Sequence, residues 1–166
     1  EETEDAILSK VIDHAPRKKA KGGIIVKGVD DILIRFGKCC RPVRGDSIIG
    51  YITRGYGVTI HRTNCVNALK MTPEREIDVE WSKEVQETYS VKIRVQSLDR
   101  VGLLADLASN ISKNAANILS ARTETREDKI VTSFFTISVE NTGHLERVLS
   151  DIKKIKSVQE VKRIDH

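Results

Sequence analysis

The sequence predicts an α+β protein made of two small modules in succession. Short β-rich runs separated by turn residues extend from Ile24 to Trp81, whereas helix and strand patterns alternate in a regular order from Tyr89 onward. The length of 166 residues also suits two modules of about 60 to 80 residues each. The boundaries that we expect are a helix fragment and linker at 1–23, a first module at 24–84 and a second module at 88–166.

The opening segment is acidic, then helical in its spacing, then basic and glycine-containing. Apolar residues recur at Ile7, Leu8, Val11 and Ile12, and the linker begins at Pro16. The chain starts with Glu rather than Met, has no apolar run near the roughly 18 residues of a membrane span, and carries an odd number of cysteines. We therefore expect a piece of a longer soluble, cytoplasmic chain that makes no membrane contact.

The first module is expected to be a small β-rich unit with one helix. Asn64 can cap a helix that continues to about Met71, because its side chain can accept from free amides of the first turn. The expected strands are Ile24–Val26, Ile32–Phe36, Ser47–Ile52, Val58–His61 and Ile77–Trp81.

The second module follows the order strand, helix, strand, strand, helix, strand. The helical stripes begin at Leu103 and at Leu145, and the strands fall at Tyr89–Ser97, Ile118–Thr125, Ile130–Val139 and Val158–Ile164. Right-handed crossovers then favour a four-stranded antiparallel sheet with both helices on one face, which is the ferredoxin-like βαββαβ arrangement. The other face must be covered or polar.

A set of three cysteines and one histidine is the main candidate for metal binding: Cys39, Cys40, His61 and Cys65. The His61-x3-Cys65 spacing runs from a strand end into a helix start, and a loop at Cys39-Cys40 could complete a tetrahedral Cys₃His zinc site. Two alternatives remain: buried cysteines that act as small hydrophobes, or a reactive cysteine pair. No oxyanion site or third partner for a nucleophile is apparent.

Positive charge is concentrated around these residues. From Ile24 to Lys70 there are eight Lys and Arg against three acids, whereas Met71 to Glu87 has two bases and six acids. Guanidinium groups can hold phosphates and an exposed tyrosine can stack on an unpaired base, so structured RNA is one expected partner and a solvated basic face is the alternative. The candidate RNA contacts are Lys38, Arg41, Arg44, Arg54, Tyr56 and Arg62.

A turn before the first helix of the second module is a candidate small-ligand site. Free amides at a helix start attract a carboxylate, and Gly102 lacks a side chain that would block close approach. Asp99 could instead cap the helix, and Asn117 could add a polar contact. The candidate ligand residues are Asp99, Arg100, Val101, Gly102, Leu103, Leu104 and Asn117.

Two stretches carry a family resemblance. The first module, with its Cys-Cys-Arg-Pro loop at 39–42 and the run from Gly50 to Cys65, resembles the zinc-finger (RIS) domain in the C-terminal region of long Rel/SpoT stringent-response enzymes. The second, with Asp99-Arg100-Val101-Gly102-Leu103-Leu104, resembles the ACT domain that follows it in those proteins. Together the resemblances cover about residues 24–166.

The resemblance implies a regulatory rather than a catalytic role. Family members make and degrade (p)ppGpp through N-terminal catalytic domains, so the parent would be a GTP pyrophosphokinase, a (p)ppGpp hydrolase or both. The family's cysteine module contacts large-subunit ribosomal RNA, and its ACT domains pair as dimers and bind amino acids, branched-chain ones in some relatives. We therefore expect a ribosome-binding regulatory region, or alternatively an amino-acid sensor that acts without ribosome contact.

Overall fold

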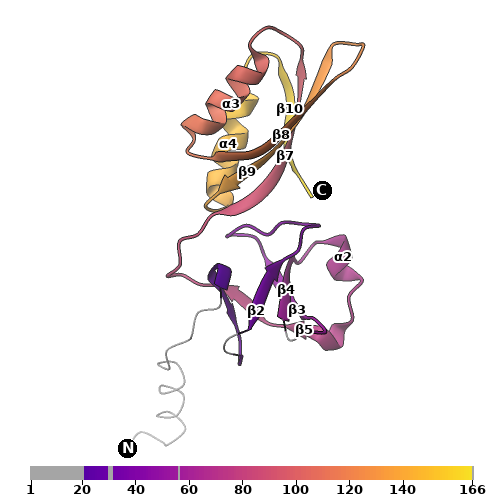
Figure 1. Cartoon of the computed structure of the whole chain (residues 1–166), viewed down its shortest axis with the longest axis vertical. Helices are drawn as coiled ribbons and strands as arrows, with labels where there is room; N and C mark the ends of the chain where they lie inside the picture. Colours follow the sequence, from indigo (N-terminus) through magenta and orange to yellow (C-terminus); the bar gives the residue numbers. More distant parts are fainter. Residues whose placement is uncertain (1–20, 30–31, 56, 166) are drawn as a thin grey trace, which may run out of the picture.

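The computed structural model describes residues 21–29, 32–55 and 57–165. The helix fragment expected near the start and the candidate RNA contact Tyr56 lie outside these residues. The two modules follow one another along the long axis of the molecule (Figure 1). The α+β class predicted from the sequence is confirmed.

The first module contains a four-stranded sheet in the order β2-β4-β3-β5 and a separate antiparallel pair of β1 with β6. Strand β2 runs parallel to β4, and the remaining pairs in the larger sheet are antiparallel. Ile24, Val58 and Ile60 are fully or almost fully buried between the two sheets. The elements are η1 (Lys21–Gly23), β1 (Ile24–Val26), β2 (Leu33–Phe36), β3 (Ile48–Ile52), β4 (Gly57–Arg62), α2 (Val66–Leu69), η2 (Pro73–Arg75), β5 (Glu76–Ile77) and β6 (Val79–Trp81).

Two local predictions for this module were wrong. The strand expected at Ile77–Trp81 is two strands that part at Asp78, because β5 pairs with β3 while β6 pairs with β1 in the other sheet. The helix does not begin with an Asn64 cap, since Cys65 is the N-cap and no cap side chain accepts a hydrogen bond there. The amide of Cys65 instead closes a turn onto the carbonyl of Arg62, which leaves Cys65 next to the end of β4.

The second module has the expected ferredoxin-like topology, with the antiparallel strand order β10-β7-β9-β8. Both helices cover one face of this sheet (Figure 1). Alternate residues of β7 and the inward stripes of the helices, such as Ile93, Leu107 and Val148, are completely buried between the layers. The elements are β7 (Tyr89–Leu98), α3 (Leu103–Lys113), β8 (Asn117–Thr125), β9 (Ile130–Val139), α4 (Thr142–Lys153) and β10 (Val158–Ile164).

The face of this sheet opposite the helices is polar rather than covered. Lys92 and Arg94 of β7 pair in register with Thr136 and Phe134 of β9, and all four side chains are partly exposed. The guanidinium of Arg122 lies 4.8 Å from the centre of the Phe134 ring, within the range of a cation–π interaction with this partly exposed residue. The sheet therefore needs no further layer.

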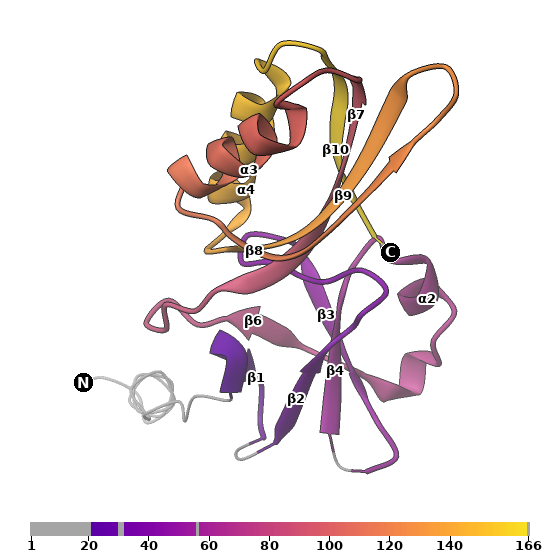
Figure 2. The same ribbon diagram turned by 45° about the horizontal axis from the view of Figure 1, so that its top comes forward.

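The loop between β2 and β3 packs against the second module (Figure 2). Val43 in this loop is completely buried in the hydrophobic core of the second module. Asp46 receives two hydrogen bonds from Arg163 of β10, at 2.9 Å to Oδ1 and 2.8 Å to Oδ2. The amide of Thr142, at the start of α4, donates to the carbonyl of Arg44 at 2.8 Å. The modules keep separate sheets but share a packed and hydrogen-bonded seam.

Candidate metal centre

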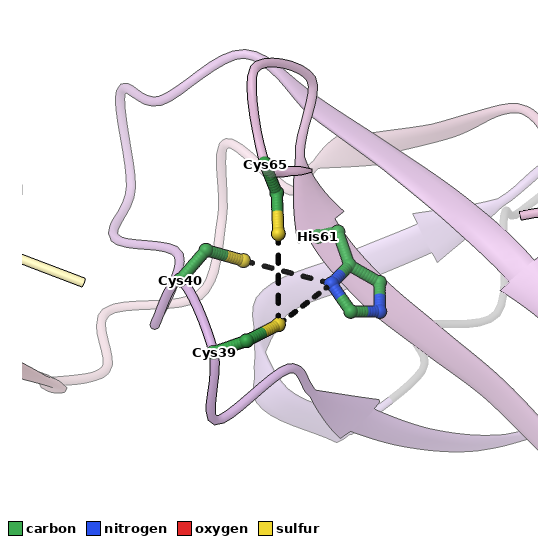
Figure 3. A group of neighbouring side chains, drawn as sticks. All are labelled: Cys39, Cys40, His61 and Cys65. Carbon is green, nitrogen blue, oxygen red and sulfur yellow. Dashed lines mark hydrogen bonds between the residues drawn. The ribbon is translucent and has the colours of Figure 1, made fainter. Parts of the chain in front are cut away.

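Cys39, Cys40, His61 and Cys65 converge on one point of the first module (Figure 3). The two adjacent cysteines lie in the turn after β2, His61 lies on β4, and Cys65 lies at the start of α2. The parallel pairing of β2 with β4 brings the end of β2 beside His61. His61, Cys40 and Cys65 are buried, and Cys39 is partly exposed.

The distances match the edges of a tetrahedron around zinc. The Nδ1 atom of His61 lies 3.3 Å from the sulfur of Cys39 and 3.6 Å from that of Cys40, and the sulfurs of Cys39 and Cys65 are 3.6 Å apart. Zinc bonds of normal length give about 3.6 Å between sulfur and nitrogen and about 3.8 Å between two sulfurs. All four ligand atoms lie within 4.8 Å of one another, so these residues fit a Cys₃His site.

The electrostatics of the cluster couple metal binding to the loss of thiol protons. Burial raises the pKa of Cys40 to about 12, although the amide of Arg62 donates to its sulfur at 3.4 Å. Burial opposes ionisation of Cys65 too, but hydrogen bonds from the amides of Ala68 and Asn67 and from neighbouring thiols lower its pKa overall. Three thiolates this close would repel one another, and a divalent metal removes that repulsion while replacing the thiol protons.

His61 is prepared to act as a ligand through Nδ1. Burial lowers its pKa, which keeps the imidazole neutral near pH 7 and its Nδ1 lone pair available. The Nε2 atom is buried and has no hydrogen-bond partner among the described residues. Gly37 lies behind the ring, because a Cβ atom at this position would be 2.7 Å from both Cε1 and Nδ1 of His61. This role for Gly37 is not among the sequence predictions, and the signal for it in the sequence is a glycine close to a cysteine pair.

Three of the predicted RNA-contacting cations are engaged within the molecule. Arg41 donates to the hydroxyl of Ser90 at 2.9 Å, and Arg44 donates to two carbonyls of the segment between the modules and lies 5.9 Å from the centre of the Trp81 ring. Arg62 forms an ion pair with Asp165 at 3.0 Å. Lys38 and Arg54, by contrast, are exposed.

The candidate ligand turn begins α3 in a different way from a side-chain cap. Gly102 is the N-cap, with a left-handed φ of 79°, and no cap side chain accepts a hydrogen bond. Asp99 therefore does not cap the helix. Arg100 stabilises the turn through Asp106, at 2.7 Å, and through the carbonyl of Lys156. Leu103 points into the core at 5% exposure, whereas Val101 and Leu104 are 99% and 50% exposed.

Asn117 is not brought to this turn within one chain. It pairs with Ser138 of β9, which in turn pairs with Ser90 near the start of β7, whereas the turn follows Leu98 at the far end of that strand. Eight residues of strand separate the two levels by about 27 Å. The prediction that Asn117 contacts the same ligand therefore fails for a single chain.

Fold and site together define a class: a small module with a Cys₃His cluster that could hold a metal ion, joined to a ferredoxin-like domain. Comparison with known families makes this specific, because residues 24–82 match the RelA/SpoT RIS domain and residues 85–163 match the ACT domain. The chain belongs to the RelA/SpoT family.

Individual relatives agree with this assignment. The chain is 39% identical over 166 residues to a GTP pyrophosphokinase of Streptomyces antibioticus, matching 99% of this chain and 20% of the relative. It is 36% identical to the bifunctional (p)ppGpp synthase/hydrolase RelA of Mycobacterium tuberculosis, covering 99% and 22% respectively, and 31% identical to SpoT of Escherichia coli, covering 95% and 23%. The chain thus spans about a fifth of the length of these relatives.

Among solved structures, the crystal structure of the ACT domain from a GTP pyrophosphokinase of Chlorobium tepidum aligns with 47% of this chain and 100% of that domain. Its TM-score is 0.43 and its sequence identity is 27%. Within the described residues, no helix is both long enough and apolar enough to cross a membrane.

Proposed function

We propose that the chain is the regulatory region of a cytoplasmic RelA/SpoT enzyme that makes or degrades (p)ppGpp, and that it binds ribosomal RNA and transmits an amino-acid starvation signal to catalytic domains elsewhere in the parent. The observation that carries this proposal is the succession of a Cys₃His module and an ACT domain in one docked unit. Relatives named as GTP pyrophosphokinases and (p)ppGpp hydrolases support it.

Zinc is the proposed resident ion of the first module. Cys39, Cys40, His61 and Cys65 would hold it, and its chemistry there is structural, because four protein ligands leave no open position. A native mass spectrum of the chain should show one zinc per chain that is lost on Cys65→Ser. A metal-free spectrum together with selective alkylation of one thiol would favour the reactive-cysteine alternative instead.

Ribosomal RNA contact is proposed for exposed cations of the first module. Lys38 lies beside Cys39, and Arg54 lies at the turn between β3 and β4. Arg35 and Lys70 are also exposed in this module and were not among the residues predicted from the sequence. Arg41, Arg44 and Arg62 would act differently, by holding the module against the ACT domain.

Co-sedimentation of the full-length parent with ribosomes tests this proposal. Lys38→Glu combined with Arg54→Glu should weaken binding and make it less sensitive to salt, because each phosphate contact contributes roughly 0.9 to the slope of log affinity against log salt on duplexes. Lys153→Glu, at the exposed end of α4, is the matched control. Two results would reject RNA contact at these positions: no co-sedimentation, or co-sedimentation that depends neither on salt concentration nor on Lys38 and Arg54.

Amino-acid sensing is a second proposed function, and it is supported by the helix start at Gly102. The turn has no side-chain cap, and the exposed Val101 and Leu104 could contact an apolar side chain. Valine, isoleucine or leucine would place its carboxylate near the free amides of α3. The ligand can shift the regulatory state only by its difference in affinity for the two states.

A homodimer would reunite Asn117 with this turn. Strand β8 is an edge strand, paired only with β9 in the part of the chain that the structure describes. Side-by-side pairing of two β8 strands about a two-fold axis is antiparallel, so the start of one β8 would lie beside the end of the other. The end of β8, at Thr125, is level with Ser97 next to the turn. Asn117 of the partner subunit would therefore reach the ligand site.

A proline substitution in the edge strand β8 tests the proposed homodimer and the proposed amino-acid binding together. Ala121→Pro should abolish dimerisation in sedimentation equilibrium and weaken amino-acid binding in calorimetry, because proline cannot donate to a new strand pair. Ala105→Ser, at an exposed position of α3, should leave the dimer intact. A monomeric wild type, or no heat with any of the three amino acids at millimolar concentration, would remove the sensor proposal.

A further inference from the structure

A cavity of about 280 Å³ lies at the seam between the two modules, apart from the helix start at Gly102. One wall comes from the end of β2 and the cysteine loop, and the other comes from the segment that enters β7. The residues that matter are Phe36, Lys38, Arg41, Pro42, Glu87 and Tyr89. The volume is near the lower end of the range for small-molecule sites, which limits the ligand to a small metabolite.

The apolar part of the wall is held in place by stacked rings. The rings of Phe36 and Tyr89 meet edge to face at 5.8 Å, and Trp81 stacks on Phe36 at 6.0 Å. The hydroxyl of Tyr89 is engaged outside the cavity, where it donates to the carbonyl of Gly22 at 3.1 Å. Pro42 is buried beside them. This rigid wall suits a short aliphatic body.

The polar part of the wall is dominated by Arg41. This residue has a left-handed φ of 42°, a conformation that a non-glycine residue adopts only when its surroundings enforce it. Its carbonyl accepts from Arg163 at 2.9 Å, and its Nη1 donates to Ser90. Its Nε is buried without an acceptor among the described residues. The Nε atom is therefore not reached from the cavity, and the fixed guanidinium can meet a ligand there only through its Nη atoms.

The charges around the cavity define the ligand class. Lys38 and Arg41 supply two cations, and Glu87 supplies one anion. We propose that this cavity binds a small organic carboxylate with an apolar body, its carboxylate held by Lys38 and Arg41 and its carbon chain lying against Phe36 and Pro42. The ligand class has two natural sources, since a free amino acid would add an ammonium contact to Glu87 and a keto acid would not.

Both modules contribute to the cavity, so a bound ligand would stabilise their docked arrangement. A ligand that binds only the docked state multiplies the ratio of docked to undocked molecules by one plus the ratio of its free concentration to its dissociation constant. Lys38 and Arg41 also flank the Cys39-Cys40 pair, which connects the cavity directly to the metal centre. This site does not depend on RNA binding or on the ACT turn.

Calorimetric titration of the zinc-loaded full chain with leucine and with ketoisocaproate, its keto acid, tests the proposal. Lys38→Met should weaken binding of both compounds about tenfold, because it removes one charge contact and, at an exposed position, leaves the fold intact. Lys113→Met, at the exposed end of α3, should change nothing. Glu87→Gln should weaken leucine alone if the ligand is an amino acid; equal binding of both compounds by this variant supports a simple carboxylate.

Two results would overturn the proposal. One is the absence of binding by both compounds at millimolar concentration. The other is binding that survives Lys38→Met but is lost on Val101→Glu, which would place the ligand at the ACT turn instead. Failure of ribosome co-sedimentation would leave these results unaffected, so the two proposals can be rejected separately.

Discussion

Loss of the Asp46–Arg163 pair should destabilise the whole chain, because this pair closes the seam. The side chains of Asp46 and Arg163 are only 9% and 13% exposed, and two hydrogen bonds at 2.8 and 2.9 Å connect them. Removing one member of a buried pair typically costs about 3 to 5 kcal/mol. Since both groups retain slight exposure, we expect about 3 kcal/mol from Asp46→Ala.

Urea unfolding of the zinc-loaded chain measures this loss directly. Trp81 is the single tryptophan, and its indole donates to the carbonyl of Asp46 at 2.9 Å, so its fluorescence reports on the seam. With a urea slope of about 2 kcal/mol per molar, the midpoint should fall by about 1.5 M. Circular dichroism records the second module at the same time.

A double-mutant cycle separates the pair from other effects of the substitution. Asp46→Ala also removes the acceptor of the Val43 amide, so the single variant overstates the ion pair. Asp46→Ala, Arg163→Met and their combination should give a coupling energy of about 2 kcal/mol. The Arg94–Glu160 pair, at 28% and 48% exposure, is the matched control and should give less than about 0.5 kcal/mol. Equal coupling in the two cycles would refute the reasoning.

Three further predictions concern the metal centre and the seam. Gly37→Ala should lower zinc affinity at least about tenfold in competition with a chromophoric chelator, because the added Cβ meets the His61 ring; Gly55→Ala, which meets nothing within 4 Å, should not. Zinc binding should release protons and weaken as the pH falls, because the raised pKa of Cys40 leaves its thiol protonated in the metal-free chain; calorimetry in two buffers of different ionisation heat measures the protons, and equal heats would contradict the prediction. Burial raises the pKa of Tyr89 above 10.0 in the folded chain. The stability that this raised pKa contributes is complete below pH 10 and is lost as the pH rises through the higher folded-state value. Tyr89→Phe should therefore make the alkaline loss of stability shallower, and an unchanged pH profile would contradict the prediction.

The second module was predictable from the sequence almost element by element. Its strands and helices are long enough for a period of two residues to be distinguished from a period of 3.6. The apolar faces that these periods predict are the ones buried in the core. Short elements of the first module were less predictable, as the split at Asp78 shows. There the two halves of one apolar run pair with different strands, β3 and β1, and no local pattern encodes that choice.

The candidate metal centre was predictable in its members but not in its geometry. Cysteine and histidine are rare side chains with a restricted chemistry, so their types and the His61-x3-Cys65 spacing singled out Cys39, Cys40, His61 and Cys65 as candidate ligands, and the structure brings these four together. Their separations, and the need for Gly37 behind the imidazole, depend on the parallel pairing of β2 with β4. The start of α3 was less predictable, because the sequence does not show whether Asp99 or Gly102 occupies the N-cap position.

What the sequence alone determined is therefore the order of the modules, the topology of the second one and the identity of the candidate metal ligands, because these depend on local periodicity and on residue chemistry. Only the tertiary structure decided which charges are free. Arg41 finds Ser90 across 49 residues and Arg163 finds Asp46 across 117. A charged side chain has the same appearance in sequence whether its partner is water, RNA or a distant carboxylate, because the fold alone sets which groups meet and how much water remains between them.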